Sequence, residues 1–553
     1  MLQRAADFDF NQTRVSVTPC RHAGASLAKG VLAGDCVVCP WHAARFNVNS
    51  GDIEDGPICD ALHNFQTTVS GGQVYVDLPL KDGKVVVPRK RTPKMACRGT
   101  DDARHFVVVG GGPASAVAVE TLRSEGFTGK ITMVTKEPEL PYDRTALSKS
   151  FTPTGDNEPQ LIRSREFYDK LNVNLALGTT ATGLDPTEHS VSLKGPSGEE
   201  ETVMQYDKIL VATGGDARAF VPKEGFSISG STLRGIFVLR DAGDVRSITT
   251  ALALGSPGKK VVVVGSSFIG MEAAAFLAKK TKSRNGTPAP VASVTVVGME
   301  TVPFERVLGT KIGGMIQQRA EAEGVRFYMQ DVVNEFVPME GDDSALGEVE
   351  LRGGETLEAD MVIIGAGIIP ATGWLQNAAG VTIKEPRAGG GVQCDEFLCA
   401  HASGDVFVAG DVAHFPYAHA TSDNTRNLRI EHYDVAMDHG RVAARNMLGR
   451  KVRYEVVPFF WTGLFNMKIR YAGHARTIDD VIIHGSLGDS TTKPAFTAYY
   501  VTGDVVSGAV TINDDPNAVA CLELLRARAM PSAQELASSS SFDPVTYLAK
   551  QQS

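Results

Sequence analysis

The chain reads HFVVVGGGPAS at residues 105–115 and repeats the pattern as KVVVVGSSFIG at residues 260–270. Each stretch is an apolar strand that enters a glycine-rich turn, and each is followed by a helix-like segment and a second apolar strand. A strand, a glycine turn, a helix and a further strand make up one dinucleotide-binding unit. Two such units predict an α/β chain with two Rossmann-like domains built on mainly parallel sheets.

Segments outside these two units extend the same architecture. Three more apolar runs end at glycines, DKILVATG (207–214), DMVIIGAG (360–367) and DVFVAGD (405–411), and we interpret them as further buried strands. Short alternating stretches after residue 449 predict a small α+β domain, and the turn-rich start of the chain predicts a small all-β domain. The expected division is a β domain at 1–80, a linker at 81–104, a first dinucleotide domain in two parts at 105–232 and 366–450, a second at 233–365, and a C-terminal domain with a flexible tail at 451–553.

The composition is that of a globular protein. The chain has 553 residues and a formal net charge of −9, with 43% hydrophobic and 22% charged residues. This length allows three or four domains, and disordered or collagen-like chains are excluded. The mildly acidic balance gives no electrostatic basis for nucleic-acid binding. The 56 glycines exceed the usual proportion, as expected of a chain with several phosphate-binding turns.

Cysteine use and the first residues indicate the compartment. Eight cysteines in a chain of this length do not make a disulfide scaffold, and the start, MLQRAADFDF, has no secretory apolar core. The apolar stretch at 261–278 contains Glu272, and we interpret it as a strand that turns into a helix rather than as a membrane span. We expect a soluble protein, monomer or homodimer, in a reducing compartment: the cytoplasm, with the mitochondrion as the alternative.

The N-terminal region carries two pairs of cysteine and histidine. Cys20 and His22 form C-x-H, and Cys39 and His42 form C-x-x-H sixteen residues later. Two thiolates that hold one iron and two imidazoles that hold the other are the ligand set of a Rieske [2Fe–2S] centre. The same residues could bind zinc, but zinc modules usually pair Cys with Cys and His with His. The mixed loops favour the Rieske interpretation, and their flanking residues resemble the cluster-binding loops of Rieske ferredoxins.

The length of chain before the first loop is unusual. Only nineteen residues precede Cys20, whereas Rieske modules normally have several strands there. The sequence therefore predicts either a truncated start or a minimal cluster domain. Cys36 and Cys59 lie outside the motif, and we interpret them as structural thiols.

The first glycine-rich turn fits a pyrophosphate site. Gly110 and Gly112 allow a tight turn and a close approach to phosphate at a helix N-terminus, and Ser115 replaces the third glycine of the fingerprint. An acid some twenty residues further on should bind a ribose. Glu137 is the candidate, because Lys136 occupies the place where related proteins often have the acid.

The second glycine-rich turn carries the fingerprint on Gly265, Ser267 and Gly270. The strand that follows ends at Gly298, so the carboxylate that usually favours NAD is missing there, although Glu300 lies two residues later. Arg284 is a conceivable partner for a 2′-phosphate. The choice between NADH and NADPH stays open on these residues.

The order of the motifs is more specific than any one of them. The first fingerprint, ATGG (212–215), the second fingerprint, GAG (365–367) and AGD (409–411) form the series found in two-dinucleotide flavoproteins. With PYDRTALSK at 141–149 and PFFW at 458–461, this series resembles the apoptosis-inducing-factor and oxygenase-coupled ferredoxin reductase family over about residues 18–530. The resemblance is strongest to its apoptosis-inducing factor 3-like branch, which has a fused N-terminal Rieske domain.

The resemblance implies cofactors and the residues that bind them. FAD is expected in the first Rossmann-like domain and NADH or NADPH in the second, in a glutathione-reductase-like arrangement. The resemblance implies that Asp411 binds the FAD ribitol and that Arg144 lines the flavin. It also implies that Lys149 and Glu272 form a catalytic pair beside the flavin. A buried lysine needs a carboxylate partner, and a cation near the flavin stabilises its anionic reduced form. The other implied cofactor-binding residues are Ala212, Gly214, Gly367, Gly410, Glu431, His432 and Tyr433, the last in place of the usual tryptophan.

These parts imply an NAD(P)H-dependent ferredoxin reductase-type oxidoreductase. Electrons are expected to pass from NAD(P)H through FAD to the chain's own cluster, and on to an unknown acceptor such as an oxygenase, a cytochrome or a quinone. The alternative is a signalling protein like the apoptosis factors, in which nicotinamide and flavin redox state controls partner binding. We expect no Cys-x-x-x-x-Cys redox pair after the first fingerprint, which excludes the disulfide reductases of this fold, because their chemistry requires that thiol pair.

Overall fold

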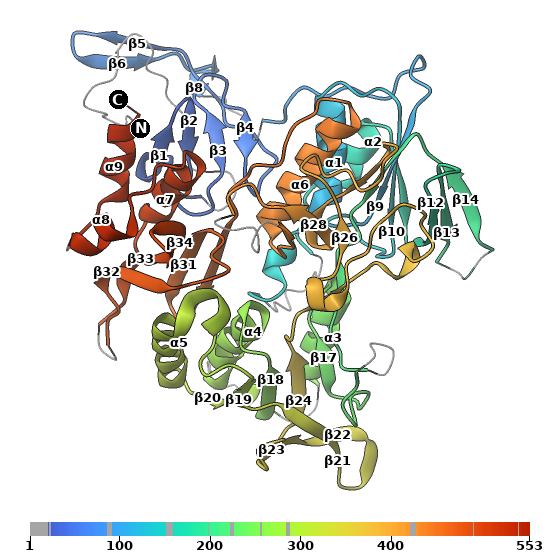
Figure 1. The fold of residues 1–553 in the computed structure, drawn as a ribbon, viewed down its shortest axis with the longest axis vertical. Helices are drawn as coiled ribbons and strands as arrows, with labels where there is room; N and C mark the ends of the chain where they lie inside the picture. The colour runs from blue at the N-terminus through green and yellow to red at the C-terminus, as the bar shows by residue number, and fades with distance from the viewer. Residues whose placement is uncertain are drawn as a thin grey trace.

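The computed structural model describes residues 20, 24–85, 91–150, 159–196, 198, 200–221, 226–254, 257–283, 288–420, 427–489, 492–539 and 541–552. In Figure 1 a small N-terminal β region lies beside the C-terminal helices and their antiparallel sheet, and two parallel sheets with their helices form most of the rest of the molecule. This arrangement confirms the predicted class, an α/β chain with a small all-β part and a C-terminal α+β part.

The N-terminal region is a four-stranded antiparallel sheet in the order β1-β2-β3-β4. Its core is small and contains Cys20, Cys39 and Phe46. Two hairpins follow it, β5 with β6 and β7 with β8. The bounds of these elements are η2 (Leu27–Lys29), β1 (Val31–Ala33), β2 (Cys36–Val38), β3 (Arg45–Asn47), β4 (Ile53–Asp55), β5 (Thr67–Ser70), β6 (Gln73–Val76), β7 (Leu80–Lys81) and β8 (Lys84–Val85).

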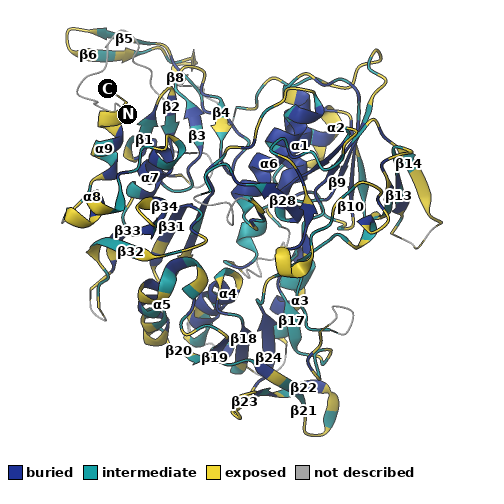
Figure 2. Ribbon diagram, in the orientation of Figure 1, coloured by how far each residue is buried: buried dark blue, intermediate teal, exposed yellow. Residues whose placement is uncertain are grey.

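The first dinucleotide-binding region is a parallel five-stranded sheet in the order β11-β10-β9-β15-β27. Its central strands are rich in valine and isoleucine because helices cover the sheet, as burial in Figure 2 shows. The main elements are β9 (His105–Val109), α1 (Pro113–Ser124), β10 (Lys130–Thr135), η3 (Arg144–Ala146), α2 (Arg165–Lys170), β11 (Val173–Leu177), β15 (Lys208–Val211), β27 (Val406–Val408), η8 (Gly410–Val412) and α6 (Tyr433–Met447).

Small antiparallel additions surround this sheet. They are two three-stranded sheets, β12-β13-β14 and β26-β28-β29, and one two-stranded sheet, β16-β25. Their bounds are β12 (Thr180–Asp185), β13 (Ser190–Lys194), β14 (Thr202–Gln205), β16 (Gly215–Ala217), β25 (Ile368–Pro370), η6 (Gly373–Leu375), η7 (Pro386–Ala388), β26 (Val392–Gln393), β28 (Ala413–Pro416) and β29 (Asn427–Leu428).

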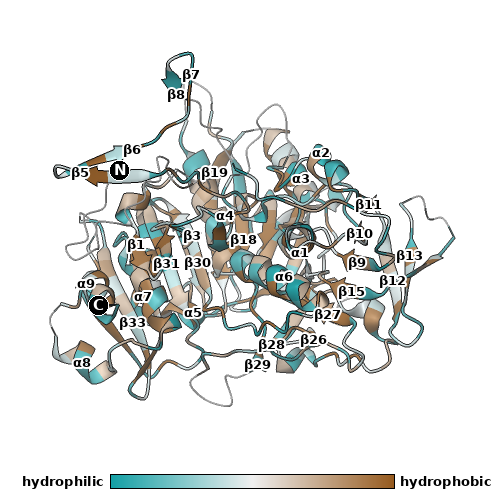
Figure 3. Cartoon of the chain, turned by 90° about the horizontal axis from the view of Figure 1, so that it is seen from above, coloured by the Kyte–Doolittle hydropathy of each residue, from teal (hydrophilic) through white to brown (hydrophobic). Residues whose placement is uncertain are grey.

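The second dinucleotide-binding region repeats the parallel plan in the order β17-β24-β18-β19-β20. Figure 3 shows hydrophobic residues along central strands such as β18. The elements are β17 (Ile236–Val238), α3 (Ala242–Ala253), β18 (Lys259–Val264), α4 (Phe268–Ala278), η5 (Lys279–Thr281), β19 (Val291–Gly298), α5 (Glu305–Ala322), β20 (Val325–Met329), β21 (Val333–Met339), β22 (Asp342–Leu351), β23 (Thr356–Glu358) and β24 (Met361–Ile364). The two parallel sheets confirm the two predicted Rossmann-like units.

The C-terminal region is a five-stranded antiparallel sheet, β30-β31-β34-β33-β32, with helices packed beside it. β33 and β34 are buried along nearly their whole length, so both faces of these two strands are covered. The elements are β30 (Phe459–Leu464), β31 (Met467–Gly473), β32 (Asp480–Ser486), β33 (Ala495–Thr502), β34 (Val505–Ile512), α7 (Asn517–Arg526), α8 (Ala533–Ser538) and α9 (Pro544–Gln551).

The N-terminal region shares a hydrophobic core with the C-terminal region. Val31 and Val38 of the small β sheet belong to one buried cluster with Phe459 of β30 and Val519 of α7. Arg45 of the sheet also contacts Glu523 of α7, and Asp60 Oδ1 lies 2.7 Å from Nη1 of Arg163 in the first dinucleotide-binding region. The N-terminal sheet is therefore docked against both the first dinucleotide-binding region and the C-terminal region.

The segment predicted as a solvated linker is partly packed. Arg91 Nε donates to the Leu62 carbonyl at 2.8 Å, and the Ala96 and Gly99 amides donate to Arg123 O and Thr128 O, each at 2.8 Å. Its proline and lysine content suggested solvent exposure, but its backbone forms hydrogen bonds with both neighbouring regions. Residues 86–90 lie outside the described ranges.

The apolar stretch at 261–278 forms most of β18 and all of α4, as the sequence predicts. Among the described residues, no helix combines the length and the apolar character that crossing a membrane requires.

Candidate functional site

A cavity of about 750 Å³ lies where the two glycine-rich turns and the C-terminal sheet meet. It is lined by residues from the first dinucleotide-binding region, from α4 and from β30. Of the predicted cofactor-binding residues, all line this cavity except Ser115, Gly265 and Gly270. Gly265 belongs to the second turn itself, and Ser115 and Gly270 lie at the starts of α1 and α4, so the two fingerprints are brought to one site.

The first turn leaves a helix N-terminus open to the cavity. Gly110 has a φ of +135°, and a Cβ there would lie 2.1 Å from the Ala212 carbonyl oxygen, so only glycine fits. The N-cap of α1 is Gly112, which supplies no side-chain cap, and Pro113 is the first helical residue. Unpaired amides at such an end bind anions, which fits the pyrophosphate of a dinucleotide.

Glu137 lies at the cavity wall with two donors on its carboxylate. Tyr142 OH donates to Glu137 Oε2 at 2.7 Å, and Arg144 forms an ion pair with Glu137 Oε1. Arg144 also lies 4.8 Å from the centroid of the Tyr142 ring. Lys136, at the position of the usual acid, pairs instead with Asp216 of β16. The two carboxylates at this end of the cavity are therefore both held by cations.

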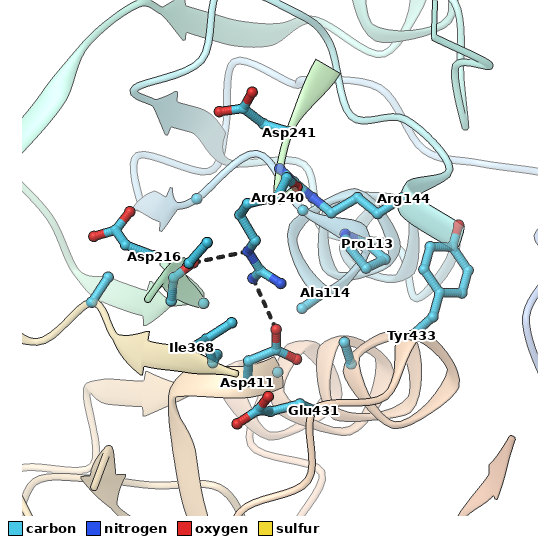
Figure 4. A pocket seen from close by; sticks show the side chains of 18 of the residues that line it. Pro113, Ala114, Arg144, Asp216, Arg240, Asp241, Ile368, Asp411, Glu431 and Tyr433 are labelled. Atoms are coloured by element: carbon cyan, nitrogen blue, oxygen red, sulfur yellow. Dashed lines mark hydrogen bonds and ion pairs between the residues drawn. The ribbon is translucent and has the colours of Figure 1, made fainter. Parts of the chain in front are cut away.

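Asp411 faces a cation from the other dinucleotide-binding region. Arg240 Nη2 lies 2.9 Å from Asp411 Oδ2, and Arg240 Nε donates to the Gly215 carbonyl at 2.9 Å (Figure 4). The η8 turn that carries Asp411 begins at Gly410. Arg240 was not predicted, because it is 171 residues from Asp411 in the chain.

Lys149 and Glu272 form the predicted ion pair. Lys149 Nζ lies 2.9 Å from Glu272 Oε1 and donates to Glu272 Oε2 at 3.1 Å. Ser148 Oγ donates to Oε2, and Thr462 Oγ1 donates to Oε1 at 2.5 Å. Glu272 is 5% exposed, so three donors from two segments stabilise a buried carboxylate. Ser148 and Thr462 were missed by sequence reasoning, although Ser148 stands inside the quoted PYDRTALSK motif.

The segment before α6 brings Glu431, His432 and Tyr433 to the cavity wall. Glu431 Oε1 lies 2.7 Å from Arg429 Nη1. Burial lowers the pKa of His432 to about 4, so its ring is neutral at physiological pH, and it packs 4.9 Å from the Phe460 ring. Burial also raises the pKa of Tyr433 well above its ordinary value.

The second turn repeats the geometry of the first. Gly265 has a φ of +114°, and a Cβ there would lie 2.4 Å from the Gly365 carbonyl oxygen. At Gly270 a Cβ would lie 1.9 Å from the Gly265 carbonyl oxygen, so α4 approaches the turn closely. Ser267 is the N-cap of α4 but makes no side-chain cap, so this helix also presents open amides. A second dinucleotide phosphate fits here.

The two cysteine loops of the N-terminal region have matching backbone hydrogen bonds. The Cys20 amide donates to Ala25 O at 2.8 Å, and the Cys39 amide donates to Ala44 O at 2.9 Å. Cys20 and Cys39 are 2% and 0% exposed. A hydrogen bond from the Cys20 thiol, the largest of several effects, lowers the pKa of Cys39 to about 7. Two adjacent, buried sulfurs with an easily formed thiolate fit one iron of a Rieske centre.

The histidine half of the predicted ligand set is partly within the described chain. His22 lies outside the described residues. His42 lies in the second loop, and its ring centroid is 4.5 Å from that of Trp461. Among the described residues, no three His, Cys, Asp or Glu side chains gather around one metal ion, and a Rieske centre needs only two protein ligands on each iron.

Trp461 connects the two sites. It lines the cavity and also packs on His42 of the cluster loop. Arg470 of β31 binds the residue before His42, because its Nε donates to the Trp41 carbonyl at 2.8 Å. The PFFW motif marked Trp461 in the sequence, but its contact with the cysteine loop spans the length of the chain and has no local signal.

The cysteines outside the loops take no part in the cavity. All eight cysteines lie in the described part of the chain, and none forms a disulfide bond. Cys394 and Cys399 do have the Cys-x-x-x-x-Cys spacing, so the expectation that no such pair follows the first fingerprint is wrong. Neither residue lines the cavity, and their thiols donate to different carbonyls, His414 O and His401 O. Burial raises the pKa of both. These two cysteines therefore supply no thiol pair at the cavity.

His439 supports the turn that carries Asp411, and its titration should be measurable. Its Nδ1 accepts a hydrogen bond from the Gly410 amide at 3.2 Å, it is 0% exposed, and burial lowers its pKa to about 3. The unfolded chain binds a proton on this residue below about pH 6.5, whereas the folded chain does not until about pH 3, so stability falls as the pH falls between these values.

Replacing His439 by asparagine keeps an acceptor for the Gly410 amide at the position of Nδ1 and removes the titration. Between pH 6.5 and pH 5 the variant should lose roughly 1.5 kcal/mol less of its free energy of unfolding than the parent chain. Urea unfolding at the two pH values measures this difference. An equal loss in both proteins would show that His439 is protonated in the folded state.

The fold and the cavity define a two-dinucleotide flavoprotein oxidoreductase with an attached Rieske domain. Family models match as Rieske [2Fe-2S] domain at residues 9–66, pyridine nucleotide-disulphide oxidoreductase at 104–440 and reductase C-terminal at 459–548. The chain belongs to the pyridine nucleotide-disulphide oxidoreductase family. It is an oxidoreductase of the ferredoxin reductase type, and its cofactors are FAD, NAD(P)H and a [2Fe–2S] cluster.

Named relatives agree with this assignment. Apoptosis-inducing factor 3 of Homo sapiens is 34% identical over 506 residues, which cover 90% of this chain and 76% of that protein. The 5,5'-dehydrodivanillate O-demethylase ferredoxin reductase subunit of Sphingobium sp. (strain NBRC 103272 / SYK-6) is 31% identical over 407 residues, 73% of this chain and 89% of that subunit. The crystal structure of the ferredoxin reductase for the CYP199A2 system from Rhodopseudomonas palustris superposes with a TM-score of 0.68 at 25% identity, covering 81% of this chain and 100% of that one.

Proposed function

We propose that this chain passes electrons from NAD(P)H through FAD to its own Rieske cluster, and from there to a separate one-electron acceptor. The observation that carries the proposal is the position of Trp461. Its ring lines the cofactor cavity and packs, 4.5 Å between centroids, on His42 of the cluster loop. One aromatic side chain thus separates the cavity from a proposed cluster ligand.

FAD supplies the chemistry that a protein side chain lacks, because it accepts a hydride and gives up electrons singly. In our proposal the first turn, with Gly110, Gly112 and Ser115, holds the FAD pyrophosphate. Asp411 and Glu137 bind hydroxyl groups of FAD, and Arg144 holds Glu137 in place. The remaining proposed contacts are Ala212, Gly214, Gly367, Gly410, Glu431, His432 and Tyr433, all on the cavity wall.

Lys149 and Glu272 are the proposed catalytic pair. Lys149 presents a cation to the cavity, which favours a negatively charged reduced cofactor. Glu272 keeps that ammonium oriented, and Ser148 and Thr462 keep Glu272 oriented in turn. The second turn, with Gly265, Ser267 and Gly270, holds the pyrophosphate of the nicotinamide donor on the other side of the same cavity.

The proposed cluster ligands are Cys20 and Cys39 for one iron and His22 and His42 for the other. Burial of both thiols keeps water from the sulfurs. Arg470 holds the second loop through the Trp41 carbonyl, and Arg470 is itself paired with Asp515. The loop and β31 are therefore fixed relative to one another.

Rapid mixing of the purified holoprotein with NADH or NADPH tests the proposal. We expect bleaching of the flavin absorbance, followed by the rhombic electron-spin signal of a reduced Rieske cluster in the same sample. A reduced flavin beside a cluster that stays oxidised would overturn the internal transfer. A long-lived reduced flavin with bound NAD⁺, together with a change of oligomeric state, would instead favour the signalling role.

Trp461 should control the second of these two steps. Trp461→Leu removes the ring between the cavity and His42 but leaves the donor side of the cavity intact, so we expect slower cluster reduction at an unchanged rate of flavin reduction. Trp461→Phe keeps an aromatic ring, so its rate of cluster reduction should lie between those of Trp461→Leu and the parent chain. Freeze-quench electron-spin measurements give the rate, and equal rates in all three proteins would remove Trp461 from the route.

The acceptor, the assembly and the compartment complete the proposal. The relative from Sphingobium is named as a subunit of an O-demethylase, which supports an oxygenase as acceptor over a cytochrome or a quinone. We propose a monomer or homodimer in the cytoplasm, with the mitochondrion as the alternative. Light scattering of the holoprotein and fractionation of the source cells test these two points.

A further inference from the structure

The loop after β19 holds a carboxylate beside the second glycine-rich turn. Ser266 Oγ donates to Glu300 Oε2 at 3.0 Å, and Arg306 Nε lies 2.9 Å from Glu300 Oε1. The Glu300 side chain is 19% exposed, so it is largely covered but still reachable from solvent. Ser266 immediately precedes the N-cap of α4, where the phosphates of a dinucleotide bind. Glu300 thus lies one side chain away from that helix end.

The end of β19 cannot carry an acid itself. A Cβ at Gly298 would lie 2.6 Å from Ser266 Oγ and 2.8 Å from Ser266 Cβ. Ser266 is 3% exposed and belongs to the turn, so it has no room to move away. An aspartate or glutamate at position 298 is excluded for this reason. Ser266 occupies that space and directs its hydroxyl at Glu300.

The backbone on both sides of this contact is fixed. The Gln330 amide donates to the Glu300 carbonyl at 3.0 Å, which ties the loop to the end of β20. The Phe304 amide donates to the Ser266 carbonyl at 3.0 Å, which ties the same loop to the glycine-rich turn. Glu300 is therefore preorganised, and little conformational entropy remains to be lost when a ligand binds it.

The carboxylate has acceptor capacity left. An ionised carboxylate offers about four lone-pair positions, and Ser266 and Arg306 occupy two of them. The two lone-pair positions that remain match the two hydroxyl donors of a ribose. A 2′-phosphate at the same place would bring up to two negative charges against Glu300 and would have no hydroxyl to donate.

We infer that Glu300 binds the adenosine ribose of the nicotinamide donor and makes NADH, rather than NADPH, the preferred donor of this chain. The inference rests on the proposed function, in which the second glycine-rich turn binds the donor. Glu300 then takes the role of the acid that usually ends this strand, two residues after Gly298. Position 298 is glycine because Ser266 leaves no room for a side chain there. Arg306 then acts as a positioning residue, because its contact is with Glu300 itself.

The experiment separates ribose recognition from electron transfer. Calorimetric titration of the holoprotein with ADP-ribose and with 2′-phospho-ADP-ribose uses ligands that lack nicotinamide. We expect the parent chain to bind ADP-ribose about tenfold or more tightly than its 2′-phosphate, and Glu300→Gln to lose about tenfold in ADP-ribose affinity and most of the discrimination. Glu323→Gln is the matched control, because Glu323 pairs with Lys282 beyond the other end of α5 and should behave as the parent.

Two results would overturn the inference: tighter binding of the 2′-phosphate by the parent chain, or unchanged discrimination in Glu300→Gln. If Glu300→Gln does not fold, Ser266→Ala removes one hydrogen bond only and should shift discrimination in the same direction by a smaller factor. Stopped-flow flavin reduction by NADH and NADPH should follow the same order of preference. A flavin that NADH reduces without any later cluster signal refutes the internal electron transfer and leaves the ribose assignment standing.

Discussion

Replacement of Cys39 by serine is expected to abolish the electron-spin signal of the reduced Rieske cluster while the flavin is still reduced by NAD(P)H. Cys39 is 0% exposed, and its sulfur contacts that of Cys20, so an alcohol in its place leaves one proposed iron without its thiolate pair. Serine is nearly isosteric, and the backbone bond from the residue 39 amide to Ala44 O remains available. The loss should therefore come from the ligand and not from the fold.

Cys36→Ser is the matched control for this variant. Cys36 is also buried and lies three residues away in β2, but it is outside the C-x-x-H motif. It should keep the cluster signal. Iron and labile sulfide analysis should agree with the spectra. A Cys39→Ser protein with a full cluster signal would remove Cys39 from the ligand set, and loss of flavin reduction as well would show that the cluster loop supports the flavin site.

Replacement of Glu272 by glutamine is expected to slow flavin reduction by about a hundredfold. The Glu272 carboxylate accepts from Lys149, Ser148 and Thr462 in a site that is 5% exposed, so a neutral amide leaves the Lys149 ammonium without its counter-charge. The amide nitrogen of the introduced glutamine would also face the hydroxyl donors of Ser148 or Thr462, whose hydrogen bonds it cannot accept. Lys149 should then leave its position at the cavity wall, and stopped-flow absorbance measures the resulting rate.

Lys149→Gln and the double variant complete a thermodynamic cycle. If the two side chains act as one unit, the double variant should be about as slow as either single variant, because each loss already removes the pair. FAD content and unfolding midpoints distinguish a catalytic effect from a folding effect. Additive losses in the double variant would show that Lys149 and Glu272 act separately.

Local patterns made the two dinucleotide-binding units predictable. In each unit a valine-rich strand enters a glycine turn, and a Cβ at Gly110 or Gly265 would meet a backbone carbonyl. The strand and the glycine are adjacent in the sequence, so the pattern can be recognised from a few residues. The same holds for the cysteine loops, since Cys20 and Cys39 stand at the start of two turns with equivalent hydrogen bonds. Parallel sheets then bring both turns to one cavity.

Contacts between distant segments were not predictable in the same way. Thr462 reaches Glu272 across 190 residues, and Arg470 reaches the Trp41 carbonyl across 429. Neither residue follows a periodic pattern or a spacing rule, because the partner is brought near only by the packing of separate sheets. Gly298 is similar, since the side chain that excludes an acid there belongs to the turn at Ser266.

The docking of the N-terminal sheet has a consequence for how an acceptor meets the cluster. Val31 and Val38 share a buried core with the C-terminal region, and Arg45 and Arg163 are paired with buried acids of other parts of the chain. Swinging the sheet outward would expose that core and strand those charges. Under the proposed function, the cluster domain would therefore stay in place and the acceptor would have to diffuse to it. Selection of that acceptor would then depend on the outward-facing surface of the N-terminal sheet rather than on the length of the segment that follows this sheet.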